Sequence, residues 1–138
     1  MIVVPDASVA IKWYVQEENT ADAEKLLDGS FELHAPELIL LEFGNIVWKK
    51  VRRKDLTSEE GSSIIKSFIR QNVTYHSHRP LLTASFIGAD LSGQTVYDWS
   101  YLALAVSLSC RFVTADKRFY GAFENIRLRK HLVWIGNI

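Results

Sequence analysis

Two aspartates directly follow short apolar runs that are typical of buried strands. Asp6 follows the run Ile2–Val4, and Asp116 follows the run Arg111–Ala115. In open α/β sheets, ligands bind outside the carboxyl ends of the strands, so both acids would share one edge of the sheet. If the two strands are neighbours, we expect the two carboxylates to lie near each other.

Two further acids interrupt apolar surroundings. Glu42 lies in the most apolar stretch of a predicted helix, and Asp98 stands at the head of another apolar helix, between Tyr97 and Trp99. A lone buried carboxylate is costly, so it needs a partner such as a cation or a metal. Each of the three aspartates precedes a predicted helix and can also serve as its N-cap. Glu42 lies in mid-helix, where capping does not account for it.

Four carboxylates in one pocket repel each other unless a hard divalent cation lies between them. Mg²⁺ or Mn²⁺ takes oxygen ligands, usually one or two carboxylates together with waters and substrate phosphate. Such an ion lowers the pKa of bound water and stabilises in-line attack on a phosphodiester. The sequence contains no phosphate-loop, dinucleotide-binding, zinc-protease or serine-hydrolase motif that would indicate another chemistry.

The elements that must position these acids follow from the periodicity of the apolar residues. Short runs that predict strands alternate with longer segments of helical period. The predicted strands are Ile2–Val4, Phe31–His34, Val73–His76, Arg111–Ala115 and His131–Ile135. The predicted helices are Ala7–Val15, Thr20–Leu27, 36 to about 53, 57 to about 71, Pro80–Leu91 and Asp98–Ser109, with a short one after Lys117. This alternation predicts an α/β domain whose mainly parallel sheet is covered on both faces.

Local signals indicate where several of these helices begin and end. Thr20 is the expected N-cap of the second helix, which ends before Gly29. Pro36 can occupy the first turn of the long helix. Thr57 and Glu60 form a capping box that opens the next one.

The charges are unevenly distributed along the chain. The 138 residues hold 16 basic and 16 acidic side chains, but residues 1–42 carry nine acids and two bases. The neutral total is therefore a cancellation, compatible with an acidic centre beside a basic rim. With 48% hydrophobic and 23% charged residues the chain is not disordered, and no apolar run is long enough to span a bilayer.

Several basic residues are candidates for contact with phosphate. Lys117 and Arg118 directly follow Asp116 and are the better candidates. Lys12 could also face the cleft, although a lysine that keeps only its ammonium in solvent is the simpler interpretation. The basic run 49–54 ends the long helix, where cations offset the helix dipole; contact with nucleic acid is the alternative there.

A single cysteine, the N-terminal segment and two histidines indicate the cellular compartment and bear on zinc binding. Cys110 is the only cysteine, so no intramolecular disulfide can form, which favours a reducing compartment. The N-terminal segment has no basic leader, and we therefore expect a cytoplasmic protein. His76 and His78 lack a third soft ligand nearby, which favours an ordinary polar loop over a zinc site.

Four segments together resemble the PIN-domain ribonucleases, especially the VapC-type toxins. In chain order they are Val4–Trp13, Ala35–Asn45, Thr95–Ala105 and Phe112–Phe119. The resemblance covers almost the whole chain and implies one three-layer α/β/α PIN-like domain over residues 1–138, with about four or five strands. It also implies an acidic metal site formed by Asp6, Glu42, Asp98 and Asp116.

The resemblance extends to residues around the acids. Ser8 and Thr114 are similar to hydroxyl residues that the family often keeps beside the metal site, and Asn45 is a weaker match one turn after Glu42. Pro5 and Trp99 depart from the family pattern. Trp99 replaces the usual small residue, so it either crowds the site or packs outward.

These observations predict an endoribonuclease that depends on Mg²⁺ or Mn²⁺ and hydrolyses RNA. Resemblance to VapC-type toxins further implies a homodimer and a small antitoxin partner, whose C-terminal segment occludes the acidic cleft with an arginine.

Two alternatives remain open. One is an α/β phosphatase or phospho-acceptor domain of another type. However, the segment after Asp6 lacks the second aspartate of haloacid-dehalogenase phosphatases, and no acid follows the strand at residues 73–75 as in a receiver domain. The other alternative is a non-catalytic PIN module that only binds RNA or protein.

Overall fold

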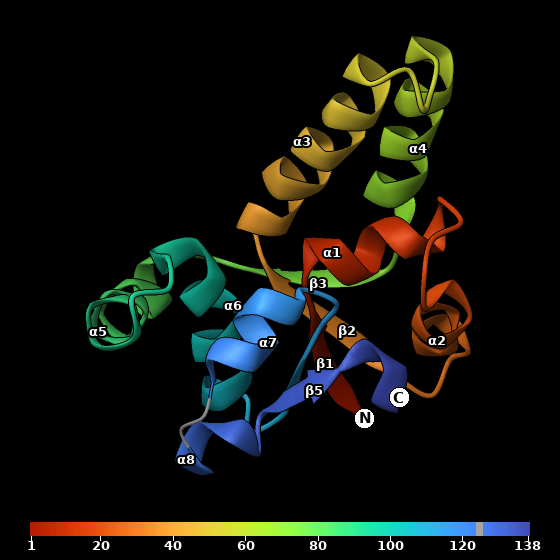
Figure 1. Ribbon diagram of the computed structural model, residues 1–138. Helices are drawn as coiled ribbons and strands as arrows, with labels where there is room; N and C mark the ends of the chain where they lie inside the picture. Colours follow the sequence, from red (N-terminus) through yellow and green to blue (C-terminus); the bar gives the residue numbers. More distant parts are fainter. Residues whose placement is uncertain (124–125) are drawn as a thin grey trace.

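The sheet at the centre of the molecule consists of five parallel strands. The computed structural model describes residues 1–123 and 126–138. The strands are β1 (Ile2–Pro5), β2 (Glu32–Pro36), β3 (Val73–His76), β4 (Arg111–Thr114) and β5 (Leu132–Trp134), in the order β3-β2-β1-β4-β5 (Figure 1). This confirms the predicted α/β/α architecture with a parallel sheet.

The strand order reverses beside the central strand. From β1 the chain proceeds outward to β2 and β3, and it then returns to β4 and β5 on the other side. β1 and β4 are direct neighbours, with Val4 opposite Phe112 and Pro5 opposite Val113. Such a reversal leaves a crevice at the carboxyl ends of the two strands, where open α/β sheets bind ligands. Asp6 and Asp116 follow these two strands, as the sequence predicted.

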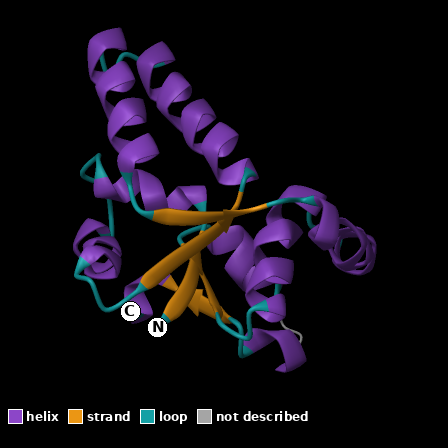
Figure 2. Cartoon of the chain, turned by 180° about the vertical axis from the view of Figure 1, so that it is seen from behind, coloured by secondary structure: helices purple, strands orange, loops and turns teal. Residues whose placement is uncertain are grey.

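Helices cover both faces of the sheet, which Figure 2 shows from behind. The α-helices are α1 (Ala7–Ala10), α2 (Thr20–Glu24), α3 (Leu38–Arg52), α4 (Ser58–Arg70), α5 (Leu82–Ser92), α6 (Val96–Ser107), α7 (Lys117–Ala122) and α8 (Ile126–Arg129). Short 3₁₀ turns are η1 (Ile11–Trp13), η2 (Lys25–Leu27), η3 (Arg79–Leu81) and η4 (Ile135–Asn137). None of the described helices combines the length and the apolar character that crossing a membrane requires.

The larger part of the core lies between the sheet and α6. Residues 99–105 of α6 are all buried, as its apolar sequence predicted. Tyr101 stacks on Phe112 of β4 with 5.6 Å between ring centres. On the opposite face, Val3 and Val113 pack with residues of α2 in a smaller core. The two cores hold β1 and β4 between them.

α3 and α4 form an antiparallel pair that extends away from the sheet (Figure 1). The predicted capping box is present: Thr57 Oγ1 accepts from the Glu60 N–H at 3.1 Å, and Glu60 Oε1 accepts from the Thr57 N–H at 3.0 Å. A Cβ atom on Gly61 would lie 2.9 Å from Val51, so glycine allows the close approach of the two helices. One side of α3, from Glu42 to Lys49, borders the crevice.

Two predicted helix starts are wrong, one because of a distant contact and the other because of a local one. Pro36 ends β2 opposite His76 instead of opening a helix. His78 Nε2 accepts from the Leu38 N–H at 2.9 Å, so a side chain forty residues away caps α3. Asn19, with φ of 63°, precedes α2, while the hydroxyl of Thr20 accepts from the Glu17 N–H at 2.8 Å.

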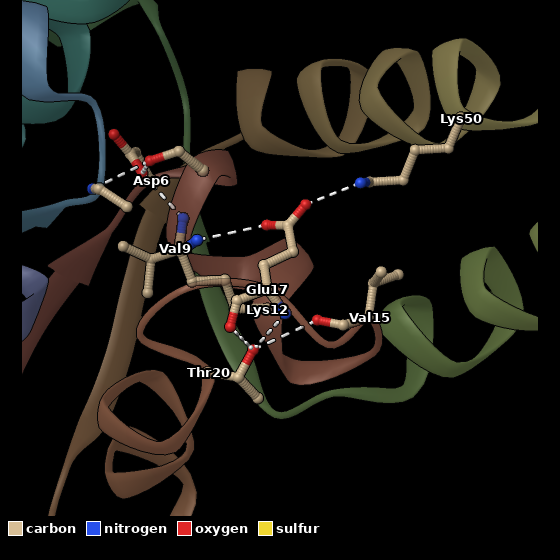
Figure 3. A network of polar contacts seen from close by, with 9 residues as sticks. Asp6, Val9, Lys12, Val15, Glu17, Thr20 and Lys50 are labelled. Carbon is tan, nitrogen blue, oxygen red and sulfur yellow. Dashed lines mark hydrogen bonds and ion pairs between the residues drawn. The ribbon is translucent and has the colours of Figure 1, made fainter. Parts of the chain in front are cut away.

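A charge cluster joins the segment after α1 to the last turn of α3. Lys12 Nζ donates to Glu17 at 3.2 Å and Lys50 Nζ donates to the other oxygen of Glu17 at 2.7 Å (Figure 3). The side chains of Lys12 and Lys50 are only 10% and 12% exposed. We call these three residues the Glu17 cluster.

We predict that Glu17→Gln destabilises the protein at neutral pH. Burial raises the pKa of Glu17, but the hydrogen bonds and charges of Lys50 and Lys12 outweigh it, so the net pKa is lowered. A lowered pKa stabilises the fold above the unfolded value of 4.5 and ceases to do so as the pH falls through the folded value. The expected loss at neutral pH is about 1–3 kcal/mol.

Urea unfolding at neutral pH and at successively lower pH values checks this prediction. The matched control is Glu18→Gln, which removes the charge of an exposed neighbour. The difference between the Glu17 variant and the native chain should shrink below pH 4.5. Equal stability of the two variants at neutral pH would contradict the role given to the Glu17 cluster.

Candidate active site

Asp6 occupies the crevice between β1 and β4 and is fixed by three donors. Its Oδ1 accepts from the Val9 N–H at 3.1 Å, which caps α1, and from Ser8 Oγ at 2.5 Å. Its Oδ2 accepts from Thr114 Oγ1 at 2.6 Å. Burial nevertheless raises the pKa of Asp6 to about 6. The carboxylate is therefore rigidly oriented but short of compensating charge.

The two hydroxyls around Asp6 also join the ends of the two strands. Ser8 Oγ accepts from the Ala115 N–H at 3.0 Å, and Thr114 Oγ1 accepts from the Asp116 N–H at 3.0 Å. Each hydroxyl thus donates to Asp6 and accepts from the backbone that leads to Asp116. The structure places Ser8 and Thr114 beside the first acid, where the resemblance put them.

Glu42 accepts a hydrogen bond from a hydroxyl that the sequence did not predict as its partner. Tyr101 Oη donates to Glu42 Oε1 at 2.5 Å. Burial, followed by the charge of Glu42, raises the pKa of Tyr101 well above 10, so the phenol remains a donor. Burial also raises the pKa of Glu42, and the charge of Asp98 adds to the effect. One signal was available: Tyr101 lies three residues after Asp98, on the same helix face.

Asp98 lies inside the first turn of α6 rather than at its head. Thr95 is the N-cap, and its Oγ1 accepts from the Asp98 N–H at 3.1 Å. The alternative in which Asp98 caps this helix is therefore not observed, and its carboxylate is free of that contact. Burial raises the pKa of Asp98; the charge of Asp116 raises it further, while that of Arg118 lowers it.

Asp116 both caps α7 and reaches the crevice. Its Oδ1 accepts from the backbone N–H groups of Arg118 at 3.0 Å and Phe119 at 3.1 Å. The N–H of Asp116 is held by Thr114, so its position depends on the same hydroxyl that fixes Asp6. Capping and a role in the site are thus compatible here.

All four acids line one pocket of about 250 Å³. Its lining residues are Asp6, Ala7, Ser8, Glu42, Asn45, Ile46, Lys49, Asp98, Tyr101 and Asp116. They come from α1, α3, α6 and the start of α7, segments far apart in the sequence. The structure thus brings the four acids together and places Asn45 with them.

The pocket suits a hard divalent cation that keeps several of its own waters. Burial and mutual repulsion raise the pKa of three of the acids, and a bound cation would reverse that effect. Within residues 1–123 and 126–138, however, no three His, Cys, Asp or Glu side chains are grouped closely enough to hold an ion alone. The four acids therefore do not form a closed cage. Mg²⁺ and Mn²⁺ fit, because they bind through few carboxylates together with water and phosphate.

The basic residues predicted to contact RNA differ in exposure and in their distance from the pocket. Lys117 and Arg118 are exposed in the first turn of α7, and the charge of Arg118 acts on Asp98. Lys12 is buried and paired with Glu17, and it does not line the pocket, so its predicted orientation toward the cleft is wrong. Lys49, which the sequence offered only within a basic run, lines the pocket instead.

Trp99 packs away from the acids. Its Nε1 donates to Ser92 Oγ at 2.7 Å, and its ring contacts Phe123 with 5.0 Å between ring centres. A Cβ on Gly88 would lie 2.2 Å from the indole, so glycine makes room for it on α5. Of the two orientations considered for Trp99, the outward one is observed.

His76 and His78 each contact a group from another element. His76 Nε2 lies 2.9 Å from His34 Nδ1, and the two rings stack. His78 accepts from the backbone of α3. His76 thus ends β3 beside His34, and His78 caps α3.

The family model and the related sequences that match this chain indicate the same family. The PIN domain family matches residues 3–123 of the chain. The chain is 33% identical over 125 residues to ribonuclease VapC3 of Pyrobaculum aerophilum, covering 89% of this chain and 95% of the relative. It is 32% identical over 118 residues to ribonuclease VapC9 of Mycobacterium tuberculosis, covering 85% and 87%.

Solved structures share the fold of this chain. The crystal structure of PAE2754 from Pyrobaculum aerophilum aligns with a TM-score of 0.75 at 21% identity, covering 99% of this chain and 85% of that one. VapBC2 from Rickettsia felis, bound to a promoter DNA fragment, aligns with a TM-score of 0.64 at 14% identity, covering 97% and 98%.

We predict that Tyr101→Phe raises the pKa of Glu42 further, because the buried carboxylate loses its hydrogen-bond donor. The phenyl ring keeps the stacking on Phe112, so the expected loss of unfolding free energy is modest, about 1–3 kcal/mol. Carboxyl chemical shifts of ¹³C-labelled glutamate, followed against pH, measure the titration of Glu42. The control is Tyr97→Phe, because Tyr97 is 63% exposed. An unchanged Glu42 titration in Tyr101→Phe would contradict the assignment.

Proposed function

This chain belongs to the PIN-domain family, and we propose that it is an endoribonuclease that uses Mg²⁺ or Mn²⁺ to hydrolyse RNA phosphodiester bonds. The observation that carries the proposal is the convergence of four carboxylates on one pocket at the reversal of strand order. Relatives over 30% identical that are named ribonucleases support it. Family membership also disfavours the alternative of a phosphatase or phospho-acceptor domain.

Some residues of the pocket would bind the divalent cation, and others orient the carboxylates that bind it. A divalent cation bound here would lower the pKa of a water molecule and neutralise charge on the scissile phosphate. Asp6, Glu42, Asp98 and Asp116 supply the oxygen atoms that hold it, directly or through water. Ser8 and Thr114 fix the orientation of Asp6, and Tyr101 fixes that of Glu42. Asn45, on the pocket wall, offers an amide to the substrate or to bound water.

We further propose that the chain is the toxin of a toxin–antitoxin pair and acts in the cytoplasm. Similarity to VapBC2 of Rickettsia felis and to a toxin–antitoxin complex from Klebsiella pneumoniae supports a small antitoxin partner. A pocket with four carboxylates suits the arginine that such a partner would insert, because the guanidinium binds carboxylates through two hydrogen bonds. Lys117 and Arg118 remain candidates for binding the RNA.

A homodimer is the proposed assembly, and α5 offers the surface for it. Large apolar side chains are exposed along this helix: Leu82, Phe86, Ile87 and Leu91 are between 52% and 83% exposed. An apolar hollow of about 170 Å³, lined by Leu82 among others, lies beside them. Exposed apolar patches of this kind mark interfaces between proteins.

Cleavage of RNA tests the proposed activity. Purified protein is incubated with structured and single-stranded RNAs in Mn²⁺, Mg²⁺ or EDTA. We expect metal-dependent cleavage, and a loss in Asp6→Asn and Asp98→Asn that exceeds the 10- to 100-fold effect typical of residues around metal ligands. The control Asp55→Asn removes an exposed carboxylate at the end of the α3–α4 pair. Cleavage that persists in EDTA, or in both site variants, would refute the mechanism.

Metal binding provides a second readout that does not need the RNA target. Mn²⁺ should raise the melting temperature of the native chain, because a ligand that binds only the folded state stabilises it. The increase should be largely absent in Asp6→Asn. Metal binding and RNA binding without cleavage of any RNA would favour the non-catalytic module.

The dimer is tested with Phe86→Glu, which places a charge in the exposed patch of α5. Sedimentation velocity should show a dimer for the native chain and a monomer for the variant, with unchanged circular dichroism. Ile69→Glu is the control, because Ile69 is 63% exposed on α4 and lies outside the proposed interface. A native chain that sediments as a monomer across the concentration range would exclude this assembly.

A further inference from the structure

One face of α3 contributes four residues to the acidic pocket. Glu42, Asn45, Ile46 and Lys49 are spaced by three, four and seven residues, which places them in one stripe along the helix. Among the described residues that line the pocket, Lys49 is the one cation. The stripe thus begins with a proposed metal ligand and ends with an ammonium group.

Lys49 differs from the other cations near the end of this helix. Lys50 is held by Glu17 in the Glu17 cluster, on another side of α3 (Figure 3). Arg52 lies over the ring of Trp48, 5.6 Å from its centre, and Arg53 Nε lies 3.8 Å from Asp55. Lys49 is exposed and forms no ion pair within the described residues. Its charge therefore remains available to a ligand in the pocket.

The distance along α3 indicates which part of a substrate Lys49 meets. Seven residues at 1.5 Å each place Lys49 about 10 Å beyond Glu42 along the helix axis. This rise separates the two backbone positions, and the lysine side chain leans back toward the helix N-terminus, so that it lines the pocket. An ion held by the carboxylates would mark the scissile phosphate, and an ammonium at the exposed edge of the pocket would meet a neighbouring phosphate. A lysine contacts phosphate as a point charge and carries no information about the base.

We propose that Lys49 binds a backbone phosphate next to the scissile one and so directs the RNA strand out of the pocket along α3. The proposal rests on the proposed ribonuclease function and adds a route for the substrate. It replaces Lys12, which is engaged with Glu17, as the lysine that serves the substrate from this side of the pocket. Lys49 is a substrate-positioning residue, and it takes no part in the chemical step.

The salt dependence of RNA binding tests the proposal directly. Anisotropy of a labelled single-stranded RNA is measured at several salt concentrations with Mg²⁺ present, in an Asp98→Asn background that blocks cleavage. Each phosphate contact on a single strand contributes about 0.7 to the slope of log affinity against log salt. Lys49→Met should lower that slope by about 0.7, and Lys49→Arg should restore it. Lys66→Met, at an exposed position of α4, should leave it unchanged.

Kinetics separate positioning from a structural effect. In the cleavage-competent chain, Lys49→Met should raise KM about tenfold, the loss expected for one charge-assisted contact, with kcat changed less than about twofold. Destabilisation alone would not change the salt slope, and Lys49→Arg controls for it. A slope and a KM equal to those of Lys66→Met would overturn the role of Lys49.

Failure of this inference is distinguishable from failure of the proposed function. A native chain that cleaves RNA together with an unaltered Lys49→Met refutes only the role of Lys49. A native chain that binds RNA without cleaving it refutes the ribonuclease, while the salt slope still decides the role of Lys49. A native chain that does not bind RNA at all overturns both.

Discussion

The site depends on one constraint: Asp6 is a buried carboxylate at the point where the strand order reverses. Its three donors come from Ser8, the backbone of Val9 and Thr114, and the same two hydroxyls hold the backbone that leads to Asp116. Because hydrogen bonds alone do not compensate the charge, burial keeps the pKa of Asp6 raised to about 6. The fold thus orders a carboxylate whose charge a bound cation would compensate. Asp116 meets it from the end of β4, and α3 and α6 bring Glu42 and Asp98 to the same pocket.

The helices that carry these acids are held by partners distant in the sequence. Tyr101 of α6 holds Glu42 of α3, and Glu17 joins Lys50 of α3 to Lys12. The first contact fixes the start of α3 at the crevice, and the second holds its last turn, where the helix extends with α4 away from the sheet. The position of Glu42 relative to Asp6 is therefore set by side chains as much as by the backbone of the sheet.

Most of the fold and the four acids were predictable from the sequence because their signals are local. Apolar runs show the strands, and Asp6 and Asp116 follow them directly. What could not be predicted depends on contacts across the chain. Pro36 ends a strand because it pairs with His76 of β3, and His78 caps α3 from forty residues away. The tyrosine partner of Glu42 is separated from it by 59 residues. Helical periodicity alone does not show which of two adjacent lysines, Lys49 or Lys50, faces an acid and which faces a pocket.

The difference between Lys49 and Lys50 also explains why zero net charge does not exclude the binding of a polyanion. A cation buried beside a carboxylate stabilises the fold but contributes little to the field outside it, as with Lys12 and Lys50 beside Glu17. Lys49 has no ion-pair partner among the described residues, so its charge is available to what enters the pocket. Net charge counts both kinds equally and therefore says little about substrate. The relevant quantity is the placement of the unpaired charges, and here the pocket combines four carboxylates with one lysine at the end of the α3 stripe. A bound ion would be needed to bring a phosphate near the carboxylates, and in our proposal Lys49 then directs the strand along α3.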